Sequence, residues 1–256
     1  MRSKIGAGLT LKRQIVGATV GIGGVVFGIF VLGWLAYLGL SHSTFFQVES
    51  VEISGNVQLE DGEILTLVGI TNHSNLVAVD TGNIEEILQK TGWVSRVRVE
   101  KTYPNTLEIE IVERKPIALV QLHDGLHYFD RHGVVFAPVK RGNDLDFPVI
   151  YFSDQSMLET EERVKNITDF LRYTRNGNPA LSIQNISQIM VDAKGNMTMY
   201  MADNPFPVQI GQTKMWQKYK RLAKVLGWLY KKKKFKTVTA IDMEYLQDRV
   251  LVSFQS

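Results

Sequence analysis

Residues 93–113 read WVSRVRVEKTYPNTLEIEIVE, and this stretch sets the fold of the middle of the chain. Apolar and polar residues alternate on both sides of the segment Tyr103-Pro104-Asn105-Thr106, where proline fixes φ for a turn. Such alternation is typical of a strand that buries one face in a core. The stretch therefore predicts two antiparallel strands joined by a tight turn. Trp93 and Leu107 are expected to be buried in the core of this sheet.

The residues upstream complete a small domain around this hairpin. Residues 46–54 alternate with period two, which predicts another strand. Residues 60–68 suit a short helix that ends at Gly69, and Asp80 is placed to cap a second helix. The expected order is strand–helix–helix–strand–strand, and it fills residues 45–115.

Downstream, residues 116–256 predict a second domain that mixes a sheet with helices. Pro116 ends the preceding strand. The helices are expected at residues 159–175 and 214–230. The strands are expected at residues 117–122, 128–136 (a hairpin), 148–150, 183–191, 197–202, 206–210, 237–245 and 249–254. The predicted fold class is α+β, with two domains after an N-terminal hydrophobic segment.

That hydrophobic segment is residues 15–41, in which 27 consecutive side chains carry no charge. A helix needs about 20 apolar residues to cross the hydrocarbon core of a bilayer. Four basic side chains lie in residues 1–14, and the next charged residue after the segment is Glu49. Basic residues stay on the cytoplasmic side. The sequence therefore predicts a cytoplasmic tail (1–14) and a single type II transmembrane helix (15–41).

Two alternatives to a membrane anchor follow from the same segment. Residues 39–41, Gly-Leu-Ser, offer a site for cleavage of a signal peptide. However, the apolar run is about twice as long as a signal-peptide core of roughly 7–15 residues. A buried soluble helix fits poorly because the run is apolar on every face.

Glycines within the segment predict a surface for helix packing in lipid. Their spacing forms two GxxxG pairs on one helix face, and small residues let membrane helices approach closely. Glycine is also simply common in membrane helices. The four residues are Gly17, Gly21, Gly24 and Gly28.

Composition narrows the function. The chain has no cysteine, which excludes disulfides and thiolate metal sites. The formal net charge of +3 is unevenly distributed, because residues 214–236 hold ten basic side chains and no acid. A uniformly basic surface for nucleic acid is absent. The basic helix is expected to face solvent, anionic lipid, wall polymer or an acidic partner.

No catalytic motif stands out. The sequence has no GxSxG, HExxH or P-loop, and it lacks a cysteine nucleophile. The best metal candidates are His123, His127 and His132 with Asp124 and Asp130. However, they lie in a predicted hairpin rather than on one helix face, and their spacing there matches no metal-ligand geometry. We therefore expect surface polar residues, no catalytic residue, no metal, no cofactor and no small-molecule substrate.

Several short motifs, in order, connect the chain to a known family. They are Val51-x-Ile53-x-Gly55-Asn56, Asn75-Leu76 with Asp80, Trp93-Val94, Tyr103-Pro104-Asn105-Thr106-Leu107, and Val112-Glu113-Arg114-Lys115-Pro116-Ile117-Ala118. With the hydrophobic segment before them, they resemble the FtsQ/DivIB family of bacterial division proteins. The resemblance implies a POTRA domain at 45–115 and an FtsQ-type C-terminal domain at 116–256. It also implies a non-enzymatic scaffold of the bacterial inner membrane, concentrated at the division septum, with FtsB/DivIC-like and FtsL-like membrane proteins as partners.

The last strand is the expected partner site. If residues 249–254 lie at a sheet edge, their unpaired backbone groups can template an added strand. The resemblance points to the same region, and the candidate partner-binding residues are Tyr245, Val250, Leu251, Val252, Ser253 and Phe254. Glu244 stands where the family often has arginine, so this chain departs from the family's charge pattern. A plain closing hairpin is the alternative.

Two other classes of protein remain as alternatives for the whole chain. One is a POTRA-bearing component of a secretion or outer-membrane assembly system, although the sequence shows no repeated ten-residue alternations after the second domain. The other is a membrane-anchored wall hydrolase, for which no catalytic constellation is found.

Overall fold

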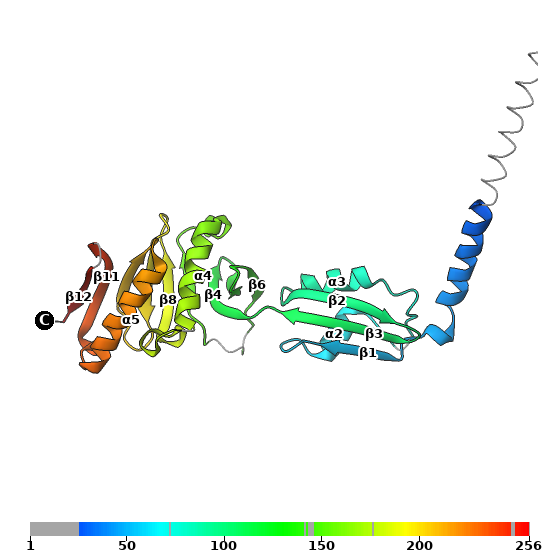
Figure 1. Cartoon of the computed structure of the whole chain (residues 1–256), viewed down its shortest axis with the longest axis horizontal. Coiled ribbons are helices and arrows are strands. Elements are labelled where there is room, and N and C mark those ends of the chain that lie inside the picture. The colour runs from blue at the N-terminus through cyan, green and yellow to red at the C-terminus, as the bar shows by residue number, and fades with distance from the viewer. Residues whose placement is uncertain are drawn as a thin grey trace, which may run out of the picture. The chain divides into compact units, whose positions relative to one another are not determined.

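In the computed structural model, the described residues are 26–71, 73–140, 142, 146–175, 177–246 and 249–255. The chain divides into two compact units, Met1–Glu113 and Arg114–Ser256 (Figure 1). Each unit has its own cluster of buried hydrophobic side chains. The two units are described separately below.

The first unit is a three-stranded sheet, in the order β1-β3-β2 among the described residues, with two helices against it. Its elements are η1 (Thr44–Phe46), β1 (Ser50–Ser54), α2 (Asp61–Val68), α3 (Thr81–Lys90), β2 (Val94–Thr102) and β3 (Thr106–Glu113). The central strand β3 pairs parallel with β1 and antiparallel with β2. This is the strand–helix–helix–strand–strand order that the sequence predicts.

The signals in the sequence act at the helix ends as expected. The carboxylate of Asp80 accepts a hydrogen bond from the backbone N–H of Asn83 at 3.1 Å, which caps α3. Gly69 ends α2 in the left-handed conformation with φ +67°, which a glycine adopts without steric cost.

The core of the first unit corrects one prediction. Leu107 is fully buried on β3, as predicted. Trp93, in contrast, is only partly buried: it lies in the turn before β2 and packs against the rim of the core. Alternation identifies the buried face of a strand, but it does not say where along the strand the covering helices end.

The second unit is built on one large mixed sheet. Among the described residues its nine strands lie in the order β12-β11-β10-β9-β8-β7-β4-β5-β6. The strands are β4 (Pro116–Leu122), β5 (Gly125–Asp130), β6 (Val135–Pro138), β7 (Val149–Phe152), β8 (Ile186–Val191), β9 (Met197–Met201), β10 (Pro207–Gly211), β11 (Val238–Leu246) and β12 (Arg249–Phe254). The pairs β4–β7, β7–β8 and β10–β11 are parallel, and the others are antiparallel.

Two long helices, α4 (Glu161–Arg175) and α5 (Met215–Lys231), cover this sheet and contact each other (Figure 1). The remaining elements are the short turns η2 (Gln155–Glu159), η3 (Pro179–Leu181), η4 (Ile183–Asn185) and η5 (Phe235–Thr237). The strand expected at 183–191 therefore begins with a 3-10 turn. Phe170 of α4 and Leu222 of α5 are fully buried in the shared core.

Residues 26–41 form a helix whose apolar side chains are mostly exposed. Within the described residues, no helix is both long enough and apolar enough to cross a membrane. The predicted span begins at residue 15, so its first part, with Gly17, Gly21 and Gly24, lies outside the described residues. Gly28 is described, and a side chain at this position would meet no atom within 4 Å.

Candidate functional site

The candidate site centres on β12, which is the outermost strand of the large sheet (Figure 1). It pairs antiparallel with β11, with Ile241 opposite Val252 and Asp242 opposite Leu251. In the described part of the chain no strand lies on its other side. One row of backbone N–H and C=O groups along β12 is therefore open to a further strand.

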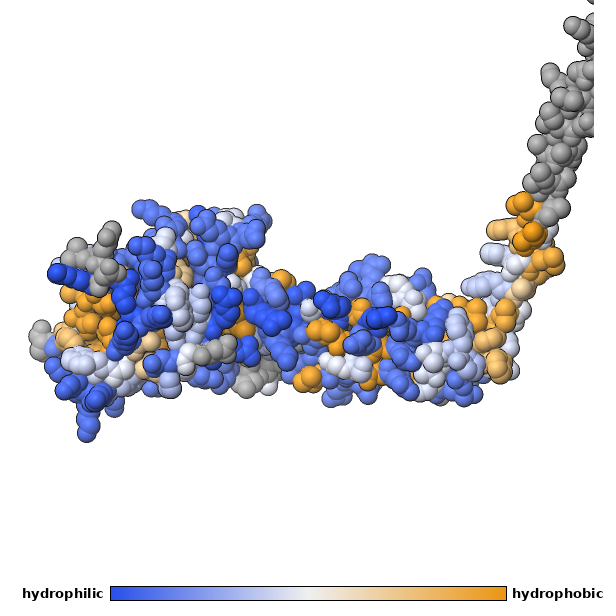
Figure 2. All heavy atoms as spheres, viewed as in Figure 1, coloured by the Kyte–Doolittle hydropathy of each residue, from blue (hydrophilic) through white to orange (hydrophobic). Residues whose placement is uncertain are grey.

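Side chains on β12 alternate between the core and solvent. Val250 and Val252 are partly buried and pack against the core of the unit. Leu251 is 43% exposed and Phe254 is 42% exposed, while Tyr245 on the neighbouring β11 is 54% exposed. Figure 2 shows hydrophobic atoms gathered at this end of the second unit, with hydrophilic atoms around them. An added strand would find both free backbone groups and apolar contacts here.

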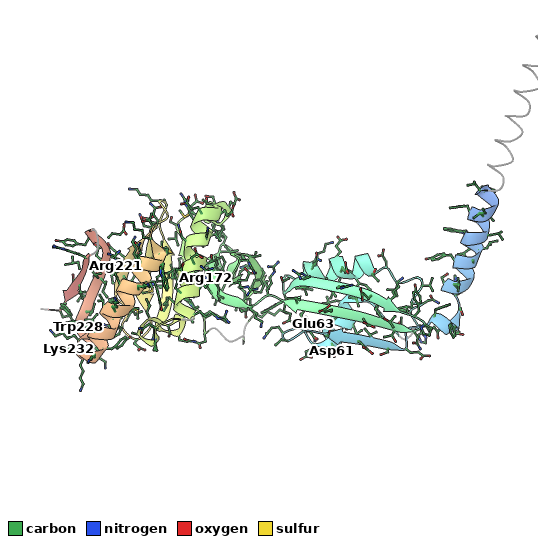
Figure 3. The ribbon with its side chains drawn as sticks, in the orientation of Figure 1. Asp61, Glu63, Arg172, Arg221, Trp228 and Lys232 are labelled. Atoms are coloured by element: carbon green, nitrogen blue, oxygen red, sulfur yellow. The ribbon has the colours of Figure 1, made fainter. Side chains whose placement is uncertain are left out.

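A basic and aromatic helix face flanks this edge. Figure 3 shows Arg221, Trp228 and Lys232 along α5 at the end of the unit where β11 and β12 lie. The Nζ atom of Lys234 lies 5.9 Å from the ring centroid of Trp228 and 5.9 Å from that of Phe254. This ammonium group thus connects the end of α5 with the last residue of β12 through cation–π contacts.

A buried lysine fixes the strand beside the edge. Lys218 of α5 is 4% exposed, and its Nζ donates to the backbone oxygen of Ile210 at 2.7 Å and to the carboxylate of Glu244. Gly211, with φ +74°, leaves room for this carboxylate, which a Cβ atom at that position would displace. Glu244 therefore serves a contact inside the chain.

Lys218 was not among the residues that the sequence singles out, although a signal for it exists. It lies three residues after Met215 and four before Leu222, so it belongs to the apolar stripe of α5 rather than to its solvent face. The lysine-rich composition of residues 214–236 hides this position, because most of the other basic side chains there are exposed.

The Lys218–Glu244 pair makes a direct prediction. Replacing Glu244 with arginine places a second cation beside the buried Lys218 and removes the carboxylate that accepts its hydrogen bond. The second unit should be destabilised by about 1–3 kcal/mol, the usual cost of depriving a buried polar group of a hydrogen-bond partner. Urea unfolding of a fragment of residues 44–256 measures the change. The matched controls are Glu244→Gln, which keeps an acceptor, and the double exchange Lys218→Glu with Glu244→Arg, which should recover part of the loss. Unchanged stability of Glu244→Arg would contradict the pairing.

The His/Asp cluster of residues 123–132 has a structural role in this fold. The carboxylate of Asp130 accepts hydrogen bonds from the backbone of His132 and Val134 and pairs with Arg114 at 2.8 Å. His127 lies 3.5 Å from Asp124. Within the described residues, no three His, Cys, Asp or Glu side chains converge on a metal position. Asp130 thus organises the turn between β5 and β6.

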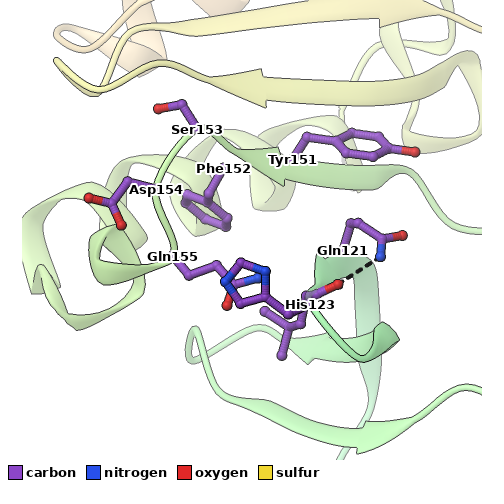
Figure 4. Close-up of a pocket in the computed structure, with 8 residues that line it drawn as sticks. Gln121, His123, Tyr151, Phe152, Ser153, Asp154 and Gln155 are labelled. Atoms are coloured by element: carbon purple, nitrogen blue, oxygen red, sulfur yellow. Dashed lines mark hydrogen bonds between the residues drawn. The ribbon is translucent and has the colours of Figure 1, made fainter.

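Two surface hollows lie on the second unit. The first, of about 340 Å³, is lined by residues that include Gln121, His123 and Asp154 (Figure 4). The Asp154 carboxylate accepts hydrogen bonds from Ser156, which hold its pKa below the ordinary value. Gln121 Nε2 donates to the backbone oxygen of Leu122 at 2.8 Å. Both polar groups therefore support the local backbone.

The second hollow, of about 650 Å³, lies at the end of α5. It is lined by Asp203, Asn204, Tyr230, Lys233, Phe235 and Lys236. Burial raises the pKa of the Tyr230 phenol, and the nearby charge of Asp203 raises it further. This phenol is therefore neutral at pH 7. Asn204 Nδ2 donates to the backbone oxygen of Phe235 at 3.1 Å, which closes one wall of the hollow.

Comparison with known proteins assigns both units. The family model described as "POTRA domain, FtsQ-type" matches residues 46–114, and the model described as "Cell division protein FtsQ/DivIB, C-terminal" matches residues 118–244. The second match ends one residue before Tyr245, so the edge strand β12 lies beyond it.

Similar proteins extend over most of the chain. A cell division protein FtsQ of Syntrophotalea carbinolica is 30% identical over 224 residues, which cover 85% of this chain and 79% of the relative. Another, from Geotalea daltonii, is 28% identical over 238 residues, covering 91% of this chain and 85% of the relative. A third, from a Geobacter species, is 28% identical over 242 residues, covering 92% and 86%.

The first unit and these matches define a POTRA-bearing protein with a second, sheet-based domain. The chain belongs to the FtsQ/DivIB family of cell division proteins, as the resemblance of its motifs implies.

Proposed function

We propose that the chain is a non-enzymatic scaffold of the division machinery that captures an FtsB/DivIC-like and FtsL-like partner complex by strand addition to β12. The observation that supports this most strongly is the position of β12 at the sheet edge. Main-chain hydrogen bonds from the edge would give the partner segment its register, and alternate side chains would give specificity. The residues assigned to this contact are Tyr245, Val250, Leu251, Val252, Ser253 and Phe254.

The proposed architecture places this site outside the inner membrane. Residues 1–14 form the cytoplasmic tail, 15–41 cross the membrane once, 45–115 form the POTRA domain and 116–256 the FtsQ-type domain. The uncharged segment and the basic residues before it support this orientation. In lipid, the glycine face of the helix (Gly17, Gly21, Gly24 and Gly28) packs against a second helix. The protein gathers at the division septum, where its partners assemble.

Removing β12 should abolish capture of the partner complex. A variant that ends before Arg249 keeps β11, which is anchored to β10 by parallel pairing, so the second unit should stay folded. Pull-down of the partner complex by the proposed exported fragment (residues 44–256) measures the effect. Circular dichroism checks that the truncated variant is folded. The scaffold proposal fails if a folded truncated variant retains the partner complex as well as the parent does.

A further inference from the structure

We propose that the first unit also binds the bilayer surface directly, through an aromatic surface formed by Phe45, Phe46 and Tyr103. The occupant of this surface is the headgroup layer of the membrane that the N-terminal helix crosses. The inference rests on the proposed membrane anchor. It adds a direct contact between the POTRA domain and lipid to the contact that the N-terminal helix makes.

The end of the N-terminal helix is fastened to the first unit by hydrogen bonds. Asn75 Nδ2 donates to the backbone oxygen of Leu40 at 3.1 Å and to that of Ser43 at 3.0 Å. The backbone N–H of Leu76 donates to the oxygen of Phe46 at 2.7 Å. The backbone oxygen of Leu40 also accepts a hydrogen bond from the N–H of Ser43 at 3.1 Å, so the end of the helix is held both by the residues that follow it and by Asn75. The helix therefore enters the unit without a loose linker.

The aromatic surface lies at the same end of the sheet. Tyr103 lies in the turn between β2 and β3, and the backbone oxygen of Asn105, two residues further along this turn, accepts a hydrogen bond from the N–H of Glu49 at 2.9 Å. The ring of Phe46 meets those of Phe45 and Tyr103 edge to face, with centroid distances of 5.1 Å and 6.1 Å. Three aromatic side chains from two segments are thus gathered beside the helix.

Two of these rings are unusually exposed for their size. Phe45 is 68% exposed and Tyr103 is 58% exposed. A large apolar ring in water is unfavourable, while the interface between water and lipid accommodates aromatic rings well. Trp34 and Tyr37, near the end of the uncharged segment, are also exposed and add two more aromatic rings before Phe45.

Helix length places this surface at the right depth. If all 27 uncharged residues of the predicted span are helical, at about 1.5 Å per residue they would extend about 40 Å, close to the roughly 40–45 Å thickness of a bilayer with its headgroups. If residue 15 lies at the inner boundary, residue 41 reaches the outer one. Phe45 follows four residues later, and Phe46 beside it contacts Tyr103, so both exposed rings would lie at the outer edge of the headgroup layer.

Single-cysteine labelling of the full chain tests this contact, and the absence of native cysteine makes the label specific. The protein is reconstituted in vesicles of phosphatidylethanolamine and phosphatidylglycerol, with or without bromine on the acyl chains near the headgroup. A bimane label is placed in Tyr103→Cys and, as a second position, in Phe45→Cys. Leu32→Cys reports the anchor. Val57→Cys is the matched control, because Val57 is 80% exposed and lies at the opposite end of β1.

The expected result is severalfold stronger quenching by brominated lipid at positions 103 and 45 than at position 57, with iodide quenching in the opposite order. If the labels at 103 and 45 behave like the one at 57 while the label at 32 is quenched by lipid, the aromatic contact is wrong and the anchor stands. If the label at 32 also escapes lipid, the anchor itself is wrong, and this inference falls with it.

Discussion

Replacing Phe170 with alanine is expected to destabilise the second unit by about 3–5 kcal/mol, the usual cost of removing a buried phenylalanine. Phe170 is fully buried on α4 and belongs to the core cluster that joins both long helices to the large sheet. The substitution removes most of a ring from a close-packed site, and the cavity that remains cannot collapse completely. Thermal unfolding of the fragment of residues 44–256 should show a midpoint lower by roughly 10 °C or more.

The matched control for this substitution is Met190→Ala on β8, where the side chain is 46% exposed. Truncation there removes little buried area, so the expected effect is within about 0.5 kcal/mol, as for most surface changes. A Phe170→Ala variant that melts with the parent protein would show that α4 does not pack on the sheet as described.

Alanine at Tyr245 or Phe254 is expected to weaken partner binding by about 2 kcal/mol each, or roughly 30-fold, because aromatic anchors dominate many interfaces. Both rings are about half exposed in the free chain, so their removal should cost the unit little stability. Isothermal titration of the fragment of residues 44–256 with the proposed partner complex measures the affinity. Thermal unfolding checks that each variant is folded.

Two exposed positions on or beside α5 serve as controls for the aromatic variants. Trp216→Ala removes a ring that is 47% exposed at the other end of the helix, and Lys232→Glu reverses a charge at the C-cap without removing a ring. Both should change the affinity less than Tyr245→Ala or Phe254→Ala. If the controls lower the affinity and the two edge variants do not, the partner binds the helix rather than the strand.

The first unit was predictable because its signals are local. Alternation on both sides of the 103–106 turn identified β2 and β3, and Asp80 and Gly69 marked helix ends at the positions where the structure has them. Trp93 was predicted to be buried and is only partly buried, because the extent of a core depends on the elements that cover it. Periodicity shows which face of an element is buried, but it does not show which other elements pack on that face.

The large sheet was less accessible to the same reasoning. Its strands were recognised one by one, but the parallel pairing of β7 with β4 and β8 joins segments far apart in the sequence. Nothing in the alternation of residues 249–254 tells an edge strand from an inner one. The edge position was expected from the chain end and from the family resemblance, and the strand order now places β12 there.

The same limit applies to the side chains of the site. Glu244 was recognised as a departure from the family's charge pattern, yet its partner could not be named. Lys218 lies 26 residues away, on a helix that packs across β10 and β11. Only the packing of α5 on the sheet brings the two together. The cation–π contact of Lys234 with Phe254 likewise depends on where η5 returns the chain to the sheet.

The most direct test of strand addition follows the backbone amides of residues 249–254 by NMR-detected hydrogen exchange, with and without the partner complex. Neighbouring amides in a strand point to opposite sides, so half of those in β12 face β11 and half face outward. We predict that binding strongly slows exchange of the outward amides and changes the inner ones little. Unchanged exchange along β12, with partner bound and protection appearing elsewhere, would contradict the account.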